Sequence, residues 1–262
     1  MNAFWKGIGI LPAAALLVAC GSGGDDSSPS VTVGEAQGVY TGSFSSVGLP
    51  VGRFSTLVLD NDEFWTLYGE EGSNGELIVY GLIQGQGASN RGSFTSLALR
   101  DYYFNGDSAS GSINATYTVG STFRGTVSSA GQSVSFAGVV PAPGVSSYVY
   151  NTPAVLSDIT GTWSGTNMGG VDSSYTISAG GTFSGVNEFG CGFSGTIGPR
   201  SSGKNVFDVT LINNTSQECG AASGLTGRGV ALSAVLANAS RQLTVAVVTS
   251  DRAYGSVIFA TR

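Results

Sequence analysis

Glycine limits how this sequence can fold more than any other feature, because it occurs 41 times among 262 residues. Each glycine in a helix interior costs about 1 kcal/mol relative to alanine, so long helices are disfavoured. The segments between the glycines are short and rich in Ser, Thr, Val, Tyr and Phe, which suit strands. Apolar residues make up 41% of the sequence, too many for a disordered chain. We therefore expect an all-β protein with glycine-rich turns.

A short motif occurs twice and suggests two related halves. It reads GVYTGS at residues 38–43 and GTWSGT at residues 161–166, so both copies have the order glycine, any residue, aromatic, hydroxyl, glycine, hydroxyl. Self-similarity over a long period indicates repeated structural units, with chance resemblance between Gly- and Ser-rich strands as the alternative. Residues 141–158 contain three prolines and no regular period, which is typical of a linker.

Alternating apolar and polar residues and turn signals predict eight strands in residues 38–140 and eight in residues 159–262. Short turns, such as the one at residues 60–62, indicate antiparallel hairpins. Eight antiparallel strands can close into a small barrel filled by its own side chains, which removes exposed strand edges. We therefore predict two eight-stranded antiparallel β-barrel-like domains, with β-sandwiches as the alternative.

The N-terminus has the features of a secretory signal peptide. Residues 1–19 carry one positive charge, Lys6, followed by an apolar run shorter than the roughly 20 residues that span a bilayer. A buried helix or a membrane anchor is the alternative. The next feature, LVAC at residues 17–20, resembles the lipobox of bacterial lipoproteins, which are cut before the cysteine. The resemblance implies that Cys20 is lipidated and that membrane lipid is its partner.

The residues after the cysteine bear on where the protein resides. By resemblance to lipoprotein sorting signals, Gly21 favours the outer membrane, on either its periplasmic or its cell-surface face. Residues 20–37 are small, polar and weakly acidic, which predicts a flexible tether spanning about 20–25 Å.

The formal net charge is −6, and Lys204 is the single lysine after residue 19. We expect no nucleic-acid partner, because phosphate contacts need clustered Lys and Arg.

The sequence has three cysteines, and the lipobox resemblance assigns one of them to lipid. Cys191 and Cys219 then remain as a pair in an oxidising compartment. We predict that they form a structural disulfide, with two separate buried thiols as the alternative. The bridge would close a loop of about 28 residues and contribute about 3–4 kcal/mol.

Histidine is absent, which removes the commonest general base and the commonest metal ligand. We therefore predict no catalytic residue, no metal site and no cofactor.

The acidic run at residues 60–76 is interpreted as two polar hairpin loops. A weak calcium site or a carboxylate pair is the functional alternative, so an envelope hydrolase that uses two carboxylates is the competing function.

Aromatic residues supply the remaining candidates for a binding site. Tyr102, Tyr103 and Phe104 are consecutive, so one face of a strand cannot bury all three. Phe64 and Trp65 raise the same question earlier in the sequence. Aromatic side chains are enriched at binding hot spots, so these five residues form a candidate binding patch. A buried core with one aromatic at a barrel rim is the alternative.

The combination of lipobox, Gly- and Ser-rich tether and two small barrels resembles Gram-negative surface lipoproteins, in particular the transferrin-binding protein B and factor-H-binding protein families. The fragments GTFSG at residues 181–185 and GFSGT at residues 192–196 resemble strands of those barrels. The strings FWTLYG and GCGFSGTI also look like those of uncharacterised proteobacterial lipoproteins. The resemblance implies a lipid-anchored outer-membrane protein that acts as a non-enzymatic binding or structural module. Its ligand would be a protein, a glycan or a nutrient carrier.

Overall fold

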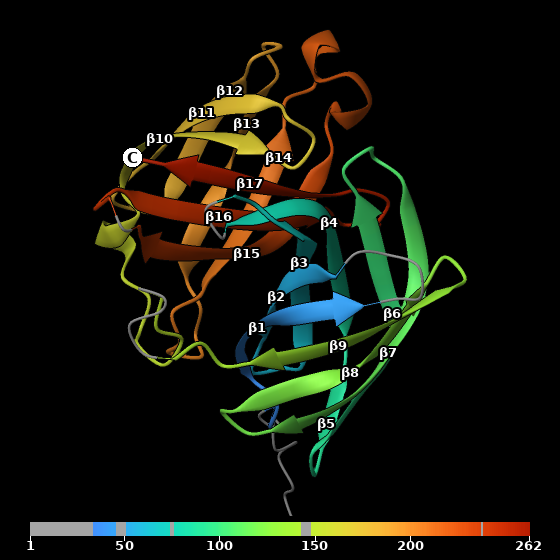
Figure 1. The fold of residues 1–262 in the computed structure, drawn as a ribbon. Helices are drawn as coiled ribbons and strands as arrows, with labels where there is room; N and C mark the ends of the chain where they lie inside the picture. The colour runs from blue at the N-terminus through green and yellow to red at the C-terminus, as the bar shows by residue number, and fades with distance from the viewer. Residues whose placement is uncertain (1–33, 46–50, 74–75, 143–147, 237) are drawn as a thin grey trace, which may run out of the picture. The chain divides into compact units, whose positions relative to one another are not determined.

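The computed structural model describes residues 34–45, 51–73, 76–142, 148–236 and 238–262. Within these ranges the regular structure is antiparallel β-strand, apart from two short 3-10 helices, η1 (Leu156–Asp158) and η2 (Gln217–Ala222). Figure 1 colours the strands of the first half from blue to green and those of the second half from yellow to red.

The first half closes into a ring of eight strands, because β1 pairs with β9 and β4 pairs with β6. A short extra strand, β5, pairs with β6 and was not expected from the sequence. The strands are β1 (Gly38–Ser45), β2 (Gly52–Val58), β3 (Glu63–Glu71), β4 (Leu77–Gln86), β5 (Ala88–Asn90), β6 (Ser93–Tyr103), β7 (Ser108–Thr118), β8 (Thr122–Ser129) and β9 (Gln132–Val139).

The second half is a closed barrel of eight strands in chain order, and the pairing of β10 with β17 completes it. The strands are β10 (Gly161–Asn167), β11 (Asp172–Ile177), β12 (Thr182–Asn187), β13 (Gly192–Pro199), β14 (Phe207–Asn213), β15 (Thr226–Val235), β16 (Arg241–Thr249) and β17 (Gly255–Thr261). The prediction of two eight-stranded antiparallel barrels is confirmed. The sandwich alternative is wrong, because each sheet closes on itself.

The repeated motif has the same structural role in both barrels. The aromatic residue of each copy donates a hydrogen bond to the carbonyl oxygen four residues earlier, from Tyr40 Oη to Ala36 (3.0 Å) and from Trp163 Nε1 to Ile159 (2.8 Å). Both rings are fully buried, so each motif ties the segment before the first strand to the lumen of its barrel. The second glycine of the first motif, Gly42, faces β9 so closely that a Cβ atom would lie 1.9 Å from a backbone carbonyl oxygen.

Each barrel has its own apolar lumen. Aromatic rings dominate the first, where Phe94 contacts both Phe64 and Phe123 at centroid distances of 5.6 and 5.3 Å. The second is built around Trp163 and aliphatic residues such as Ile177 and Leu243. Alternation along the strands supplies both cores, since every second side chain points into its barrel.

A third apolar cluster joins the outer wall of the first barrel to that of the second. Tyr102 of β6 is at its centre: its ring lies against Gly255 of β17, where a Cβ atom would come within 2.7 Å. Its hydroxyl donates to the carbonyl oxygen of Arg252 (3.1 Å). Two ion pairs cross the same boundary, between Arg200 and Asp60 and between Arg228 and Glu63, each at 2.7 Å. Where this cluster lies, the strands of the wall are therefore covered on both faces.

Two segments lie differently from the sequence expectation. Residues 34–37, expected in the tether, belong to the first barrel: the amide of Gly34 donates to the carbonyl oxygen of Asp60 (2.6 Å), and Ala36 is fully buried. Tyr148 and Tyr150 of the expected linker pack against the cluster between the barrels. The described part of this linker therefore packs against the two barrels instead of extending away from them.

Candidate functional site

The two ends of the first barrel differ. One end is filled by residues 34–37, where Tyr117 at the end of β7 donates a hydrogen bond to Glu35 (2.6 Å) and Tyr40 contacts Ala36. At the other end, where β1, β3, β6 and β8 finish, a pocket of about 250 Å³ enters the lumen. Its lining is mostly aromatic and aliphatic and comprises Phe44, Phe54, Thr56, Thr66, Tyr68, Ile83, Asp101, Tyr103, Ile113, Phe123, Val127, Ser129, Ala130, Gln132, Val134 and Phe136.

Asp101 is the one charged side chain among the described lining residues of this pocket. It is 6% exposed, and its carboxylate accepts a hydrogen bond from the Tyr68 hydroxyl (2.7 Å). Burial raises the pKa of Asp101 above its ordinary value, and the hydrogen bond from Tyr68 opposes that shift. Burial is also the main cause of the raised pKa of Tyr68. The pocket therefore holds a carboxylate in surroundings that disfavour its charge.

A β-bulge explains why Asp101 points inward. The pairing of β6 with β7 shifts register between Ser96 and Leu99, so the alternation of side chains changes phase along β6. Before the shift, Phe94 faces the lumen; after it, Leu99 does so instead. Asp101 and Tyr103 follow Leu99 at intervals of two and line the pocket, whereas Tyr102 faces the second barrel. The sequence analysis missed Asp101, because the alternation pattern contains no sign of this bulge.

The five residues of the predicted aromatic patch do not lie together at one surface. Phe64 is buried in the lumen, and Trp65 and Tyr102 are buried between the barrels. Phe104 is exposed and lies beside the ring of Tyr80, whereas half-buried Tyr103 lines the pocket. The expectation assumed that one face of each strand is solvated, but here the lumen covers one face and the second barrel covers the other.

The acidic run at residues 60–76 does not converge on one point in the described structure. Glu63 is buried and accepts hydrogen bonds from Arg228 and Gln84, while Asp60 pairs with Arg200. Elsewhere in the run, Asp62 contacts Ser89, Glu70 contacts Tyr80 and Glu71 contacts Arg53. These carboxylates mainly hold the two barrels and the β3 hairpins in place.

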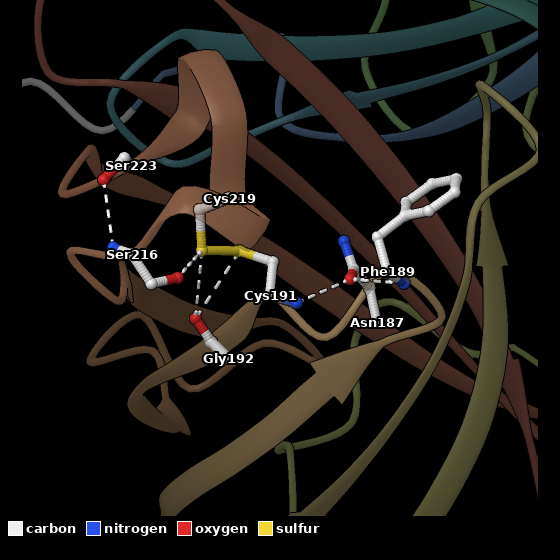
Figure 2. Close-up of a disulfide and its surroundings, with 7 residues drawn as sticks. All are labelled: Asn187, Phe189, Cys191, Gly192, Ser216, Cys219 and Ser223. Carbon is white, nitrogen blue, oxygen red and sulfur yellow. Dashed lines mark hydrogen bonds between the residues drawn. A yellow bond between two sulfur atoms is a disulfide. The ribbon is translucent and has the colours of Figure 1, made fainter.

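The predicted disulfide between Cys191 and Cys219 is present, and both cysteines are buried. It joins the turn before β13 to η2, with a Cα–Cα distance of 4.5 Å. Figure 2 shows its surroundings: the Cys191 amide donates to the Asn187 side chain (2.9 Å), and Ser216 donates to the Cys219 sulfur (3.4 Å). The bridge thereby fixes η2 at one end of the second barrel.

Two further hollows occur in the described chain. A pocket of about 240 Å³ lies beside η2 in the second barrel, between Leu211, Leu225 and Val247, and its described lining has no charged side chain. A groove of about 720 Å³ lies between the barrels and includes Arg53 and Glu76. Neither hollow combines an apolar wall with a buried charged side chain. The pocket of the first barrel is therefore the candidate binding site.

Cys20 and the whole predicted signal peptide lie outside the described residues. In the part of the chain that is described, no helix is long and apolar enough to cross a membrane.

No protein-family model and no curated protein matches this sequence. Similar solved structures include a protein of unknown function from the DUF3598 family of Nostoc punctiforme PCC 73102, with 12% identity over 87% of this chain and 95% of that chain and a TM-score of 0.26. Transferrin binding protein B from Haemophilus parasuis Hp5 has 7% identity over 88% and 78%, with a TM-score of 0.29. The isotype 1 protein from serogroup B Neisseria meningitidis has 9% identity over 88% and 77%, with a TM-score of 0.25. Because all three scores are low, the fold assignment depends on this chain's own strand pairing.

Proposed function

We propose that this chain is a lipid-anchored outer-membrane protein that binds a small, largely apolar molecule in the open end of its N-terminal barrel. The observation that carries the binding proposal is the pocket of about 250 Å³ with a buried carboxylate in an otherwise uncharged described lining. Eight-stranded barrels are either filled by their own side chains or hold one small ligand. Among the described residues, one end of the lumen is filled and the other is open.

The volume of the pocket limits the size of the ligand. A dry cavity of about 150 Å³ accommodates benzene, and typical ligand pockets start at about 300 Å³. A pocket of about 250 Å³ therefore suits one or two rings, or a ring with a short chain. A protein or glycan partner would need a surface site in addition.

The competing hydrolase function needs two carboxylates that converge on one substrate. The described lining of the pocket supplies one, Asp101, and the carboxylates of residues 60–71 contact separate partners. Binding without chemistry is therefore the function that this geometry supports best.

Equilibrium dialysis with 2-naphthol, a neutral two-ring molecule, tests the binding proposal. We expect one site per chain in the wild type and its loss in Val127→Trp, because the larger side chain enters the pocket from β8. Ser128→Trp is the matched control, since Ser128 is exposed on the same strand and should leave binding intact. Binding that survives in Val127→Trp would place the ligand elsewhere and contradict the proposal.

Membrane anchoring is tested separately through Cys20. The support for it is the LVAC sequence at residues 17–20 after an apolar run. The substitution Cys20→Ala should release the protein from the outer-membrane fraction of the cell or leave its signal peptide uncleaved. Unchanged fractionation and processing would overturn the anchor.

A further inference from the structure

The Asp101 carboxylate faces a pocket that offers it no counter-ion. The described lining contains no lysine or arginine, and the carboxylate accepts a hydrogen bond from the Tyr68 hydroxyl. A buried carboxylate is costly unless it is paired or fully hydrogen-bonded, and hydroxyls supply hydrogen bonds without opposite charge. The charge of this site is therefore complementary to a cation and repels an anion.

The rings around Asp101 favour the same kind of ligand. Tyr68 both donates to the carboxylate and presents its ring to the pocket, with the ring of Phe44 edge-on at 6.1 Å between centroids. Phe54 and Phe136 form a second edge-on pair at 5.5 Å. Aromatic faces attract ammonium groups, most strongly where water is excluded. A carboxylate among aromatic rings thus supplies both attractions that an organic ammonium can use.

We infer that the ligand of the N-terminal barrel is a small organic ammonium ion, with its cationic head at Asp101 and its apolar body against the aromatic lining. This inference rests on the proposed function and adds the chemical class of the ligand. The ammonium group supplies the missing positive charge and donates to the carboxylate. A phenyl ring on a short chain fits the volume of about 250 Å³.

A pair of matched compounds tests the inference without any variant. 3-Phenylpropylammonium and 3-phenylpropan-1-ol have the same shape and differ in one charged group. We expect the wild-type protein to bind the ammonium compound about tenfold more tightly or better, measured by isothermal titration calorimetry at pH 7. Equal affinity, or preference for the alcohol, would overturn the inference.

The variant Asp101→Asn locates the source of the preference. The amide retains an acceptor for the Tyr68 hydroxyl but removes the charge. We expect Asp101→Asn to bind both compounds alike and Asp107→Asn, a change in the exposed turn after β6, to keep the wild-type preference. A preference that persists in Asp101→Asn would also overturn the inference.

The same series separates the two proposals. Binding of 2-naphthol and of the alcohol without preference for the ammonium compound would contradict the ligand class and leave the pocket function standing. Failure of all three compounds to bind the wild type would contradict the pocket function as well.

Discussion

Asp101 illustrates, at the scale of single residues, how a binding site can oppose stability. Burial raises its pKa in the folded state above the ordinary value of 3.8, despite the hydrogen bond from Tyr68. Between the unfolded and folded pKa values the folded chain binds more protons than the unfolded chain, so stability falls as the pH rises through this window. The burial of the Asp101 carboxyl thus lowers stability at pH values where the group is ionised.

We predict that Asp101→Asn raises the free energy of unfolding more at pH 7 than at pH 3. At about pH 3 the carboxyl is largely protonated in both states, so little electrostatic penalty is removed. At pH 7, well above the ordinary pKa of 3.8, a larger penalty is removed. Urea titration of both proteins at both pH values measures this difference, in which the pH-independent effects of the amide cancel. An effect of equal size at both pH values would mean that burial does not shift the pKa of the Asp101 carboxyl.

The strand motif is the informative feature at the scale of elements. Tyr40 and Trp163 close corresponding ends of their barrels through hydrogen bonds to backbone carbonyls. The repeated motif, GVYTGS and GTWSGT, therefore has the same role at the start of β1 and of β10: its aromatic side chain covers one end of the barrel and hydrogen-bonds to the preceding segment. An unpaired buried carbonyl costs free energy, so the donor group of each aromatic residue contributes in addition to its ring.

We predict that Tyr40→Phe lowers the free energy of unfolding by about 1–3 kcal/mol, because the carbonyl of Ala36 loses its partner inside the barrel. Tyr80→Phe is the matched control: its hydroxyl bonds to Glu70 at the surface, so the same deletion should cost about 0.5 kcal/mol or less. Urea titration of the two variants makes the comparison. Equal losses of unfolding free energy in the two variants would show that the hydrogen bond from Tyr40 to Ala36 does not stabilise the barrel more than a surface hydrogen bond does.

Local sequence patterns predicted the strands but not the register in which β6 pairs with β7. Period-two alternation and glycine turns are local signals, so both barrels and their antiparallel pairing were predictable. The Cys191–Cys219 bridge was predicted from the cysteine count, once the lipobox resemblance had assigned Cys20 to lipid. The register shift between Ser96 and Leu99 depends on how β6 pairs with β7, and no local pattern in the sequence reveals it. Asp101 therefore had no recognisable role until the pairing was known.

At the scale of the whole molecule, part of the outer wall formed by β1 to β4 and β6 packs against β15 to β17 instead of facing water. Sequence patterns assign a strand one buried and one solvated face, so residues buried on the outer face were predicted to be exposed. Trp65 and Tyr102 belong to this class. The ion pairs of Asp60 and Glu63 with arginines of the second half reinforce the same boundary.

We predict that Tyr102→Ala lowers the free energy of unfolding by about 3–5 kcal/mol, because it removes a ring that is 1% exposed between the barrels. Phe104→Ala, two residues away and 59% exposed, should cost about 0.5 kcal/mol or less. Urea titration followed by circular dichroism compares them. Similar small losses would indicate that the barrels are not tightly packed together.

Methyl NMR can show whether the open end of the N-terminal barrel binds a small ligand, as we propose. Titration of isotope-labelled protein with 3-phenylpropylammonium should shift the methyl signals of Ile83, Ile113, Val127 and Val134, which line the pocket. The methyl signals of Ile177 and Val209, in the lumen of the second barrel, should stay in place. Shifts confined to the second barrel or to the groove between the barrels, or no shifts at saturating ligand, would contradict the account.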